Sequence, residues 1–146
     1  MYIVNSAHVS KGEESMNHIV LASHSKLAYG LAQTVQFFMP KVEMTVLEQT
    51  LNDEGFEEKA ISVLNDNFDK NVVVFTDLFG GSVNQVFFRQ LVNYRFHLVT
   101  GMNLALILEC VMAVDDIDAK FLRNCVNEAK NQLSYMNDLF NNTDDE

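Results

Sequence analysis

Basic residues, cysteine and proline are scarce in this sequence of 146 residues, and tryptophan is absent. The 10 Lys and Arg residues are outnumbered by 20 Asp and Glu residues, which gives a formal net charge of -10. A polyanion repels nucleic acids and anionic membrane surfaces, so we expect neither as a partner. A basic protein partner is compatible with this charge.

The two cysteines, Cys110 and Cys125, form no CxxC pair and no spacing typical of metal ligands. We interpret them as core thiols of a protein in a reducing compartment. No apolar run reaches the roughly 18 residues that cross a bilayer, and residues 1–15 lack the apolar segment of a secretory signal. The sequence therefore predicts a cytoplasmic protein with no metal site.

What is present is typical of one globular domain, with 48% hydrophobic and 21% charged residues. Residues 1–15 show neither helical nor strand periodicity, and we treat them as an N-terminal extension. Lys11–Met16 can be back-translated to a purine-rich ribosome-binding element, so our hypothesis is a translated leader with Met16 as the natural start. A genuine short extension is the alternative. The domain then spans residues 16–140, and residues 141–146 form an acidic tail.

Short apolar runs alternate with helical periodicity along the domain. The runs predict strands at Ile19–Ala22, Met44–Leu47, Val72–Phe75 and Tyr94–Thr100. The helical patterns cover Leu27–Phe38, Phe56–Leu64, Val83–Phe87, Leu104–Met112 and Phe121–Met136. This alternation predicts an α/β fold, a three-layer sandwich around a mainly parallel, flavodoxin-like open sheet. We expect at least four strands, with helices on both faces of the sheet.

Polar residues and glycines follow three of these strands, where parallel sheets place their ligand sites. His24 lies in the corner Ser23-His24-Ser25, Asp77 precedes the turn Gly80-Gly81-Ser82, and Gly101-Met102-Asn103 follows the last strand. Each has a purely structural alternative. The histidine can be idle, Asp77, Ser82 and Asn103 can cap helices, and the glycine pair can be a simple turn. Their joint position at one sheet edge favours the functional interpretation.

These residue types suit phosphoryl transfer to an imidazole. His24 supplies a ring nitrogen as the nucleophile, and Asp77 accepts a hydrogen bond from the other nitrogen to orient the ring. The backbone N–H groups of Gly80, Gly81 and Ser82 are expected to bind the phosphoryl group at a helix start, with Ser25 as a further ligand. Motifs for ATP, dinucleotides and acyl-enzyme chemistry are missing from the sequence, so no cofactor is expected.

The sequence from Met16 to about Asp138 resembles the enzyme IIA component of the mannose-type bacterial phosphotransferase system. The resemblance rests on the segments IVLASHSKLAYGL, VVVFTDLFGGSVNQ and VTGMNLALILECV. It implies that His24 is phosphorylated by HPr and passes the group to an enzyme IIB, and through it to the membrane components IIC and IID. Asp77 matches the histidine-orienting carboxylate, Gly81 and Ser82 match the phosphate turn, and the family implies a homodimer.

The sequence also departs from the family pattern. Leu78-Phe79 replaces a Thr-Trp pair, and Val83 and Ala105 stand where prolines are common. These changes fit a divergent branch for another sugar or sugar acid. Some family members exchange a C-terminal strand in their dimer, but residues 126–140 read mostly as helix here, so we do not expect the exchange.

The loop residues Leu78 and Phe79 are predicted to be exposed apolar contacts for HPr and enzyme IIB, together with Met102 and Asn103. Alternatively, Leu78 and Phe79 fold back as a lid over the sheet edge. Two other functions stay open. One is the phosphoryl donor subunit of a dihydroxyacetone kinase system, which typically lacks the Phe-Gly-Gly-Ser turn present here. The other is a non-catalytic regulatory module of the same fold.

Overall fold

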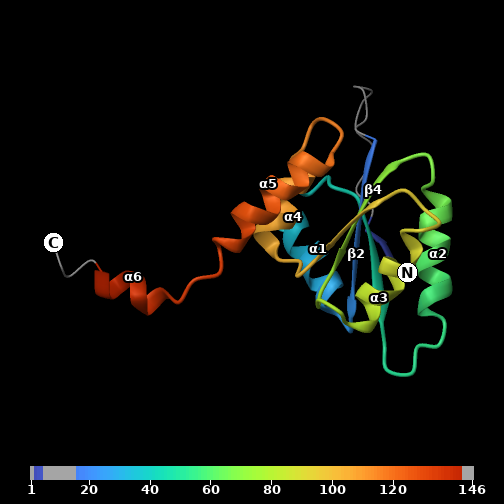
Figure 1. The fold of residues 1–146 in the computed structure, drawn as a ribbon, viewed down its shortest axis with the longest axis horizontal. Coiled ribbons are helices and arrows are strands. Elements are labelled where there is room, and N and C mark those ends of the chain that lie inside the picture. The colour runs from blue at the N-terminus through green and yellow to red at the C-terminus, as the bar shows by residue number, and fades with distance from the viewer. Residues whose placement is uncertain (1, 5–15, 143–146) are drawn as a thin grey trace.

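The computed structural model describes residues 2–4 and 16–142, which form an α/β sandwich around one twisted sheet (Figure 1). The strands are β1 (Tyr2–Val4), β2 (Asn17–His24), β3 (Met44–Gln49), β4 (Asn71–Thr76) and β5 (His97–Thr100). They lie in the order β1-β3-β2-β4-β5. The strands β2 to β5 are parallel to their neighbours, and β1 pairs antiparallel with β3. The predicted fold class is confirmed.

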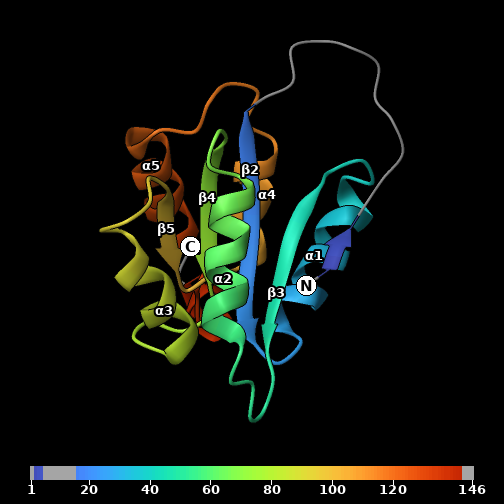
Figure 2. The same cartoon turned by 90° about the vertical axis from the view of Figure 1, so that its right-hand side faces the viewer.

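Helices cover both faces of the sheet. Their bounds are α1 (Leu27–Phe38), α2 (Phe56–Asp66), α3 (Ser82–Gln90), α4 (Leu104–Val111), α5 (Ala119–Lys130) and α6 (Met136–Asn142). Helices α1, α4 and α5 lie on one face, and α2 and α3 on the other (Figures 1 and 2). Helix α1 ends just before Pro40, as predicted, because proline cannot continue a helix.

The apolar run of β2 explains why both faces are covered. Successive strand residues point to opposite faces, so Ile19 and Leu21 pack into the core under α1, α4 and α5. Val20 and Ala22 pack into the second core under α2 and α3. All four side chains are buried. Because β2 and its neighbour β4 are held from both sides, the residues that follow them have a fixed position.

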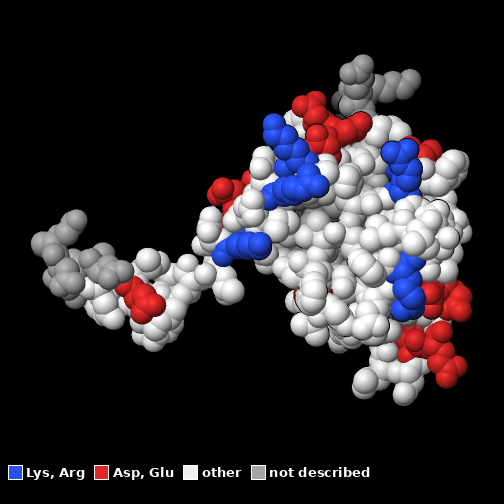
Figure 3. Space-filling model, in the orientation of Figure 1, with Lys and Arg blue, Asp and Glu red and all other residues white. Residues whose placement is uncertain are grey.

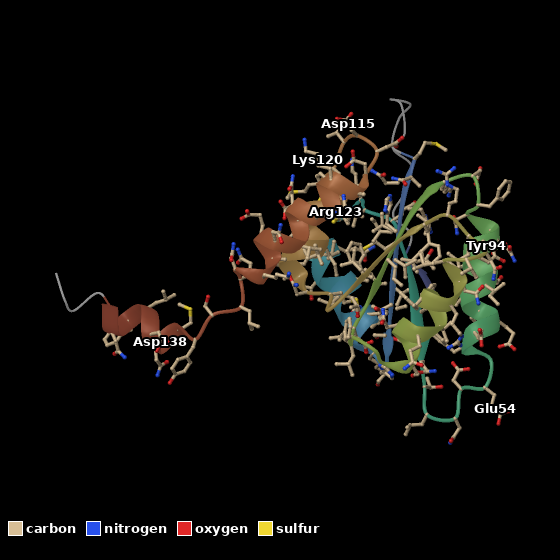
Figure 4. All side chains as sticks on the ribbon, viewed as in Figure 1. Glu54, Tyr94, Asp115, Lys120, Arg123 and Asp138 are labelled. Carbon is tan, nitrogen blue, oxygen red and sulfur yellow. The ribbon has the colours of Figure 1, made fainter. Side chains whose placement is uncertain are left out.

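Two predicted elements differ from the structure. The fourth predicted strand starts at His97 rather than Tyr94. The last predicted helix is interrupted, since α5 ends at Lys130 and α6 begins at Met136. The apolar positions Leu133 and Met136 are exposed and contact no core. Helix α6 extends away from the sandwich, as the position of Asp138 shows (Figures 1 and 4).

Strand β1 was not expected either, because residues 1–15 show no periodicity. Tyr2–Val4 nevertheless pair with Met44–Val46 at the sheet edge. This pairing does not test the hypothesis of a translated leader, which stays a prediction. The predicted acidic tail falls partly in helix α6, which reaches Asn142, and its residues 143–146 lie outside the described residues.

Candidate active site

His24 is the last residue of β2, and the chain turns sharply after it. Ser25 adopts a left-handed conformation with φ of 50°, which allows α1 to begin two residues later. Buried Ser23 stabilises the corner, because its Oγ accepts a hydrogen bond from Ala28 N at 2.7 Å and donates to Ser25 O at 3.3 Å. The side chain of His24 is 42% exposed, so its ring can meet another protein.

Asp77 follows β4, the strand next to β2, and its carboxylate holds His24 in two places. Oδ2 accepts one hydrogen bond from the His24 backbone N–H at 2.9 Å and another from ring Nδ1 at 2.8 Å. Oδ1 accepts from the Leu78 N–H at 2.9 Å. A carboxylate can only accept, so Nδ1 carries a proton and the lone pair of neutral His24 is on Nε2.

The charge state of Asp77 follows from its surroundings. Partial burial raises the pKa of Asp77, but the hydrogen bonds from the His24 ring, the His24 amide and the Leu78 amide outweigh burial. The pKa of Asp77 therefore lies below its usual value. Asp77 is ionised near neutral pH and can stabilise positive charge that develops on the ring during a reaction at Nε2.

The second ring nitrogen of His24 faces Ser82, the first residue of α3. The distance from Nε2 to Ser82 Oγ is 2.9 Å. The N-cap of α3 is Gly81, so the alternative interpretation of Ser82 as the N-cap is wrong. Ser82 Oγ also lies 2.6 Å from Oε1 of Gln49, the last residue of β3. Gln49 was missed in the sequence, because a glutamine at a strand end carries no motif.

The N–H groups of the glycine turn have acceptors in the structure. Gly80 N donates to Asn84 Oδ1 of α3 at 3.2 Å, and Gly81 N donates to Leu78 O at 3.0 Å. That these N–H groups bind the phosphoryl group stays a prediction. A Cβ on Gly81 would lie 3.0 Å from His24 Cε1, a tight contact, so glycine favours the close approach of the turn to the ring.

The donors left for a phosphoryl group are therefore at the start of α3. The first N–H groups of a helix have no partner inside the helix and carry partial positive charge. Ser82 supplies one of them in addition to its hydroxyl. The Ser25 N–H is occupied, since it donates to Gln49 O at 2.8 Å. A role of the Ser25 hydroxyl as a phosphate ligand stays a prediction.

Four exposed apolar side chains lie on the segments that follow β2, β3 and β4. We call Leu27, Leu51, Leu78 and Phe79 the apolar rim. Leu78 is 62% exposed and Phe79 is 86% exposed, so neither forms the lid that was the alternative interpretation. Leu27 and Leu51 were not predicted, because an exposed leucine looks like a core leucine in a sequence.

Two of the predicted contact residues have structural positions instead. Met102 is only 7% exposed and packs in the core under α1 and α4. Asn103 is the N-cap of α4, and its Oδ1 accepts from Leu106 N at 3.0 Å. That Met102 and Asn103 contact a partner stays a prediction. The turn after β5 starts the buried helix α4, which confirms the alternative interpretation of Asn103 as a helix cap.

Acidic side chains gather near the same edge of the sheet. Figure 3 shows Asp and Glu side chains clustered where Figure 4 labels Glu54, on the loop between β3 and α2. Across residues 2–4 and 16–142, no three His, Cys, Asp or Glu side chains are grouped so that they could hold a metal ion. Over that same part of the chain, each helix is too short or too polar to cross a membrane.

Known structures share this fold and most of its length. A mannose/sorbose-specific IIA subunit from Enterococcus faecalis is 19% identical, with a TM-score of 0.76 over 82% of this chain and 93% of that one. A IIA protein associated with a fucose utilization operon of Streptococcus pneumoniae is 26% identical, with a TM-score of 0.76 over 85% and 96%. A Klebsiella pneumoniae protein described as a sugar phosphotransferase system permease is 29% identical, with a TM-score of 0.76 over 90% and 99%.

No curated protein sequence matches the chain. The sequence model of one protein family does, over residues 18–127, and that family is described as the fructose IIA component of the phosphotransferase system, EIIA-man. The matched segment runs from His18, the second residue of β2, past β5, and it includes His24, Asp77 and the glycine turn. The chain therefore belongs to the EIIA-man family, the mannose-family enzyme IIA components that perform phosphoryl transfer in the phosphotransferase system.

Proposed function

We propose that this enzyme IIA carries a phosphoryl group on Nε2 of His24, accepts it from phosphorylated HPr and passes it to an enzyme IIB. The observation that carries this proposal is the contact of Asp77 Oδ2 with Nδ1 at 2.8 Å. This contact leaves the Nε2 lone pair as the nucleophile, on a ring that is exposed to an incoming protein.

The transfer follows from this geometry. The Nε2 lone pair attacks phosphorus, the bond between phosphorus and the donor atom breaks, and its electron pair stays with the donor. The ring keeps its Nδ1 proton and becomes positively charged, which Asp77 stabilises through the same hydrogen bond. The Ser82 hydroxyl and the N–H groups at the start of α3 donate to the phosphoryl oxygens. Attack by the acceptor on enzyme IIB reverses these steps and returns the lone pair to Nε2.

The apolar rim supports docking of two partners in turn. Leu51 and Phe79 are 95% and 86% exposed, and both lie on loops at the edge of the sheet that holds His24. Apolar side chains bordered by the carboxylates of the β3–α2 loop suit a partner with an apolar centre and basic surroundings. Phe79→Ala should weaken binding of both HPr and enzyme IIB. Phe68→Ala is the matched control, since Phe68 is 83% exposed and lies before β4, at the opposite edge.

We further propose that the protein is a cytoplasmic homodimer. The segment after α5 supports self-association, because it exposes large apolar side chains. These are Leu133, Tyr135, Met136 and Leu139. Removal of residues 131–146 should convert a dimer into a monomer in light scattering. An unchanged mass would show that the dimer, if formed, uses another surface.

The decisive experiment is incubation of the protein with phosphorylated HPr in the absence of ATP. The wild type and the His18→Gln and His97→Gln variants should acquire an acid-labile phosphoryl group, and His24→Ala should acquire none. Label on the His24→Ala variant would refute the assignment. A folded wild type that stays unlabelled would instead indicate the regulatory module. Passage of the group to an enzyme IIB, rather than to a dihydroxyacetone kinase subunit, separates the remaining alternatives.

A further inference from the structure

Gln49 lies beside the nucleophile because of the register of the sheet. The parallel pairing of β2 and β3 places Gln49 opposite His24. The backbone carbonyl of Gln49 accepts from the Ser25 N–H at 2.8 Å, which ties the end of β3 to the His24 corner. Ser82 Oγ donates to Gln49 Oε1 at 2.6 Å, and Ser82 Oγ lies 2.9 Å from His24 Nε2. The side chains of Gln49 and Ser82 form a continuous hydrogen-bond network that ends at the reactive nitrogen of His24.

The number of protons available for hydrogen bonds in this network is limited. A serine hydroxyl has one proton, so Ser82 can donate to His24 Nε2 or to Gln49, but not to both. When Nε2 carries a lone pair, Ser82 must donate to it, and Gln49 must then present its NH2 group to Ser82. When Nε2 carries a proton, Ser82 accepts from the ring and donates to Gln49 Oε1 instead. A glutamine amide can satisfy either state by turning over its terminal group.

We infer that Gln49 is a positioning residue for phosphoryl transfer, acting through the Ser82 hydroxyl. In the structure, Gln49 Oε1 accepts the Ser82 hydroxyl proton at 2.6 Å. When its terminal amide turns over, Gln49 donates N–H to Ser82 Oγ instead, which directs the single Ser82 proton at Nε2 before transfer and at a phosphoryl oxygen afterwards. This inference rests on the proposed transfer at His24.

Two substitutions of Gln49 separate this role from a packing role. Gln49→Met keeps the size of the side chain and removes the amide, which should slow transfer about 2- to 13-fold, the equivalent of one neutral hydrogen bond. Gln49→Glu provides only an acceptor, so it draws the Ser82 proton away from Nε2 and should slow transfer more than Gln49→Met does. Thr50→Glu places the same charge on the neighbouring exposed residue and is the control for charge alone.

Nitrogen-15 spectra of the His24 ring give a readout that packing would not change. In the unphosphorylated wild type at pH 7.5, we expect protonated Nδ1 and unprotonated Nε2. In Gln49→Glu, the fraction with protonated Nε2 should rise, while Thr50→Glu should match the wild type. The inference is overturned if Gln49→Glu is no slower than Gln49→Met, or if its ring spectrum equals that of the wild type.

A double-mutant cycle covers the case in which Gln49→Glu does not fold. Because Gln49 acts through Ser82, adding Gln49→Met to Ser82→Ala should cause no further loss of transfer rate, and independent losses that multiply would contradict the inference. Failure of the proposed function is recognised separately. In that case the wild type is not labelled on His24 at all, while the ring spectra still report whether Gln49 controls the Ser82 proton.

Discussion

Replacement of Asp77 by asparagine removes one charge and one acceptor from the site without changing its size. In the wild type, Oδ2 accepts two hydrogen bonds from His24, at 2.9 Å and 2.8 Å, and Oδ1 accepts one from Leu78 at 2.9 Å. The asparagine has one oxygen for these three donors. Its amide must therefore turn its NH2 group either toward Leu78 or toward His24, and the two orientations have different consequences.

The size of the effect depends on this orientation. With the amide oxygen toward His24, the ring keeps its Nδ1 proton but loses the carboxylate charge. A hydrogen bond to a charged group contributes about 1–2 kcal/mol more than a neutral one, which corresponds to roughly a 10-fold slower transfer. With the NH2 group toward His24, the amide donates to Nδ1 and moves the ring proton to Nε2. The nucleophilic lone pair is then lost, and serine protease triads lose about 10⁴-fold in the equivalent substitution.

The assay is the rate of phosphoryl transfer from phosphorylated HPr in single-turnover mixtures, combined with nitrogen-15 spectra of the His24 ring. We expect Asp77→Asn to slow transfer between about 10-fold and 10⁴-fold, with protonated Nε2 in the slow limit. Asp53→Asn is the control, because Asp53 lies near the same edge but bonds to Gly55 and Lys59. A transfer rate within about threefold of the wild type in folded Asp77→Asn would refute the orienting role.

Two further predictions concern close packing and pH. Gly81→Ala should slow transfer, because its Cβ would lie 3.0 Å from His24 Cε1 and 3.2 Å from Leu78 O. Gly30→Ala meets no atom within 4 Å and should leave transfer unchanged, so equal rates in both variants would contradict the prediction. Burial and the nearby Lys70 charge lower the pKa of His18 below 6.5, so the unfolded state binds the proton more readily. The free energy of unfolding should therefore fall from pH 7.5 to pH 5.5, by at most about 1.4 kcal/mol per pH unit. The fall should be smaller in His18→Gln. Urea denaturation at several pH values measures it, and an equal fall in the wild type and in His18→Gln would contradict the prediction.

The sequence by itself determined the fold class and the two residues at the centre of the site. The apolar runs at Ile19–Ala22 and Val72–Phe75 are typical of buried strands, and parallel strands end at one edge of their sheet. His24 and Asp77 directly follow these runs, so their proximity is a consequence of topology that a linear sequence already contains.

The tertiary structure decided which groups are available once the strands have met. Hydrogen-bond direction depends on backbone angles and on which acceptors come near, so the sequence did not reveal that the Gly80 N–H donates to Asn84 and the Gly81 N–H to Leu78. Burial depends on which helix covers a residue, so Met102 looked like a contact residue and proved to be core. Gln49 has no distinguishing motif, and its amide reaches Ser82 only because β3 pairs with β2 in this register.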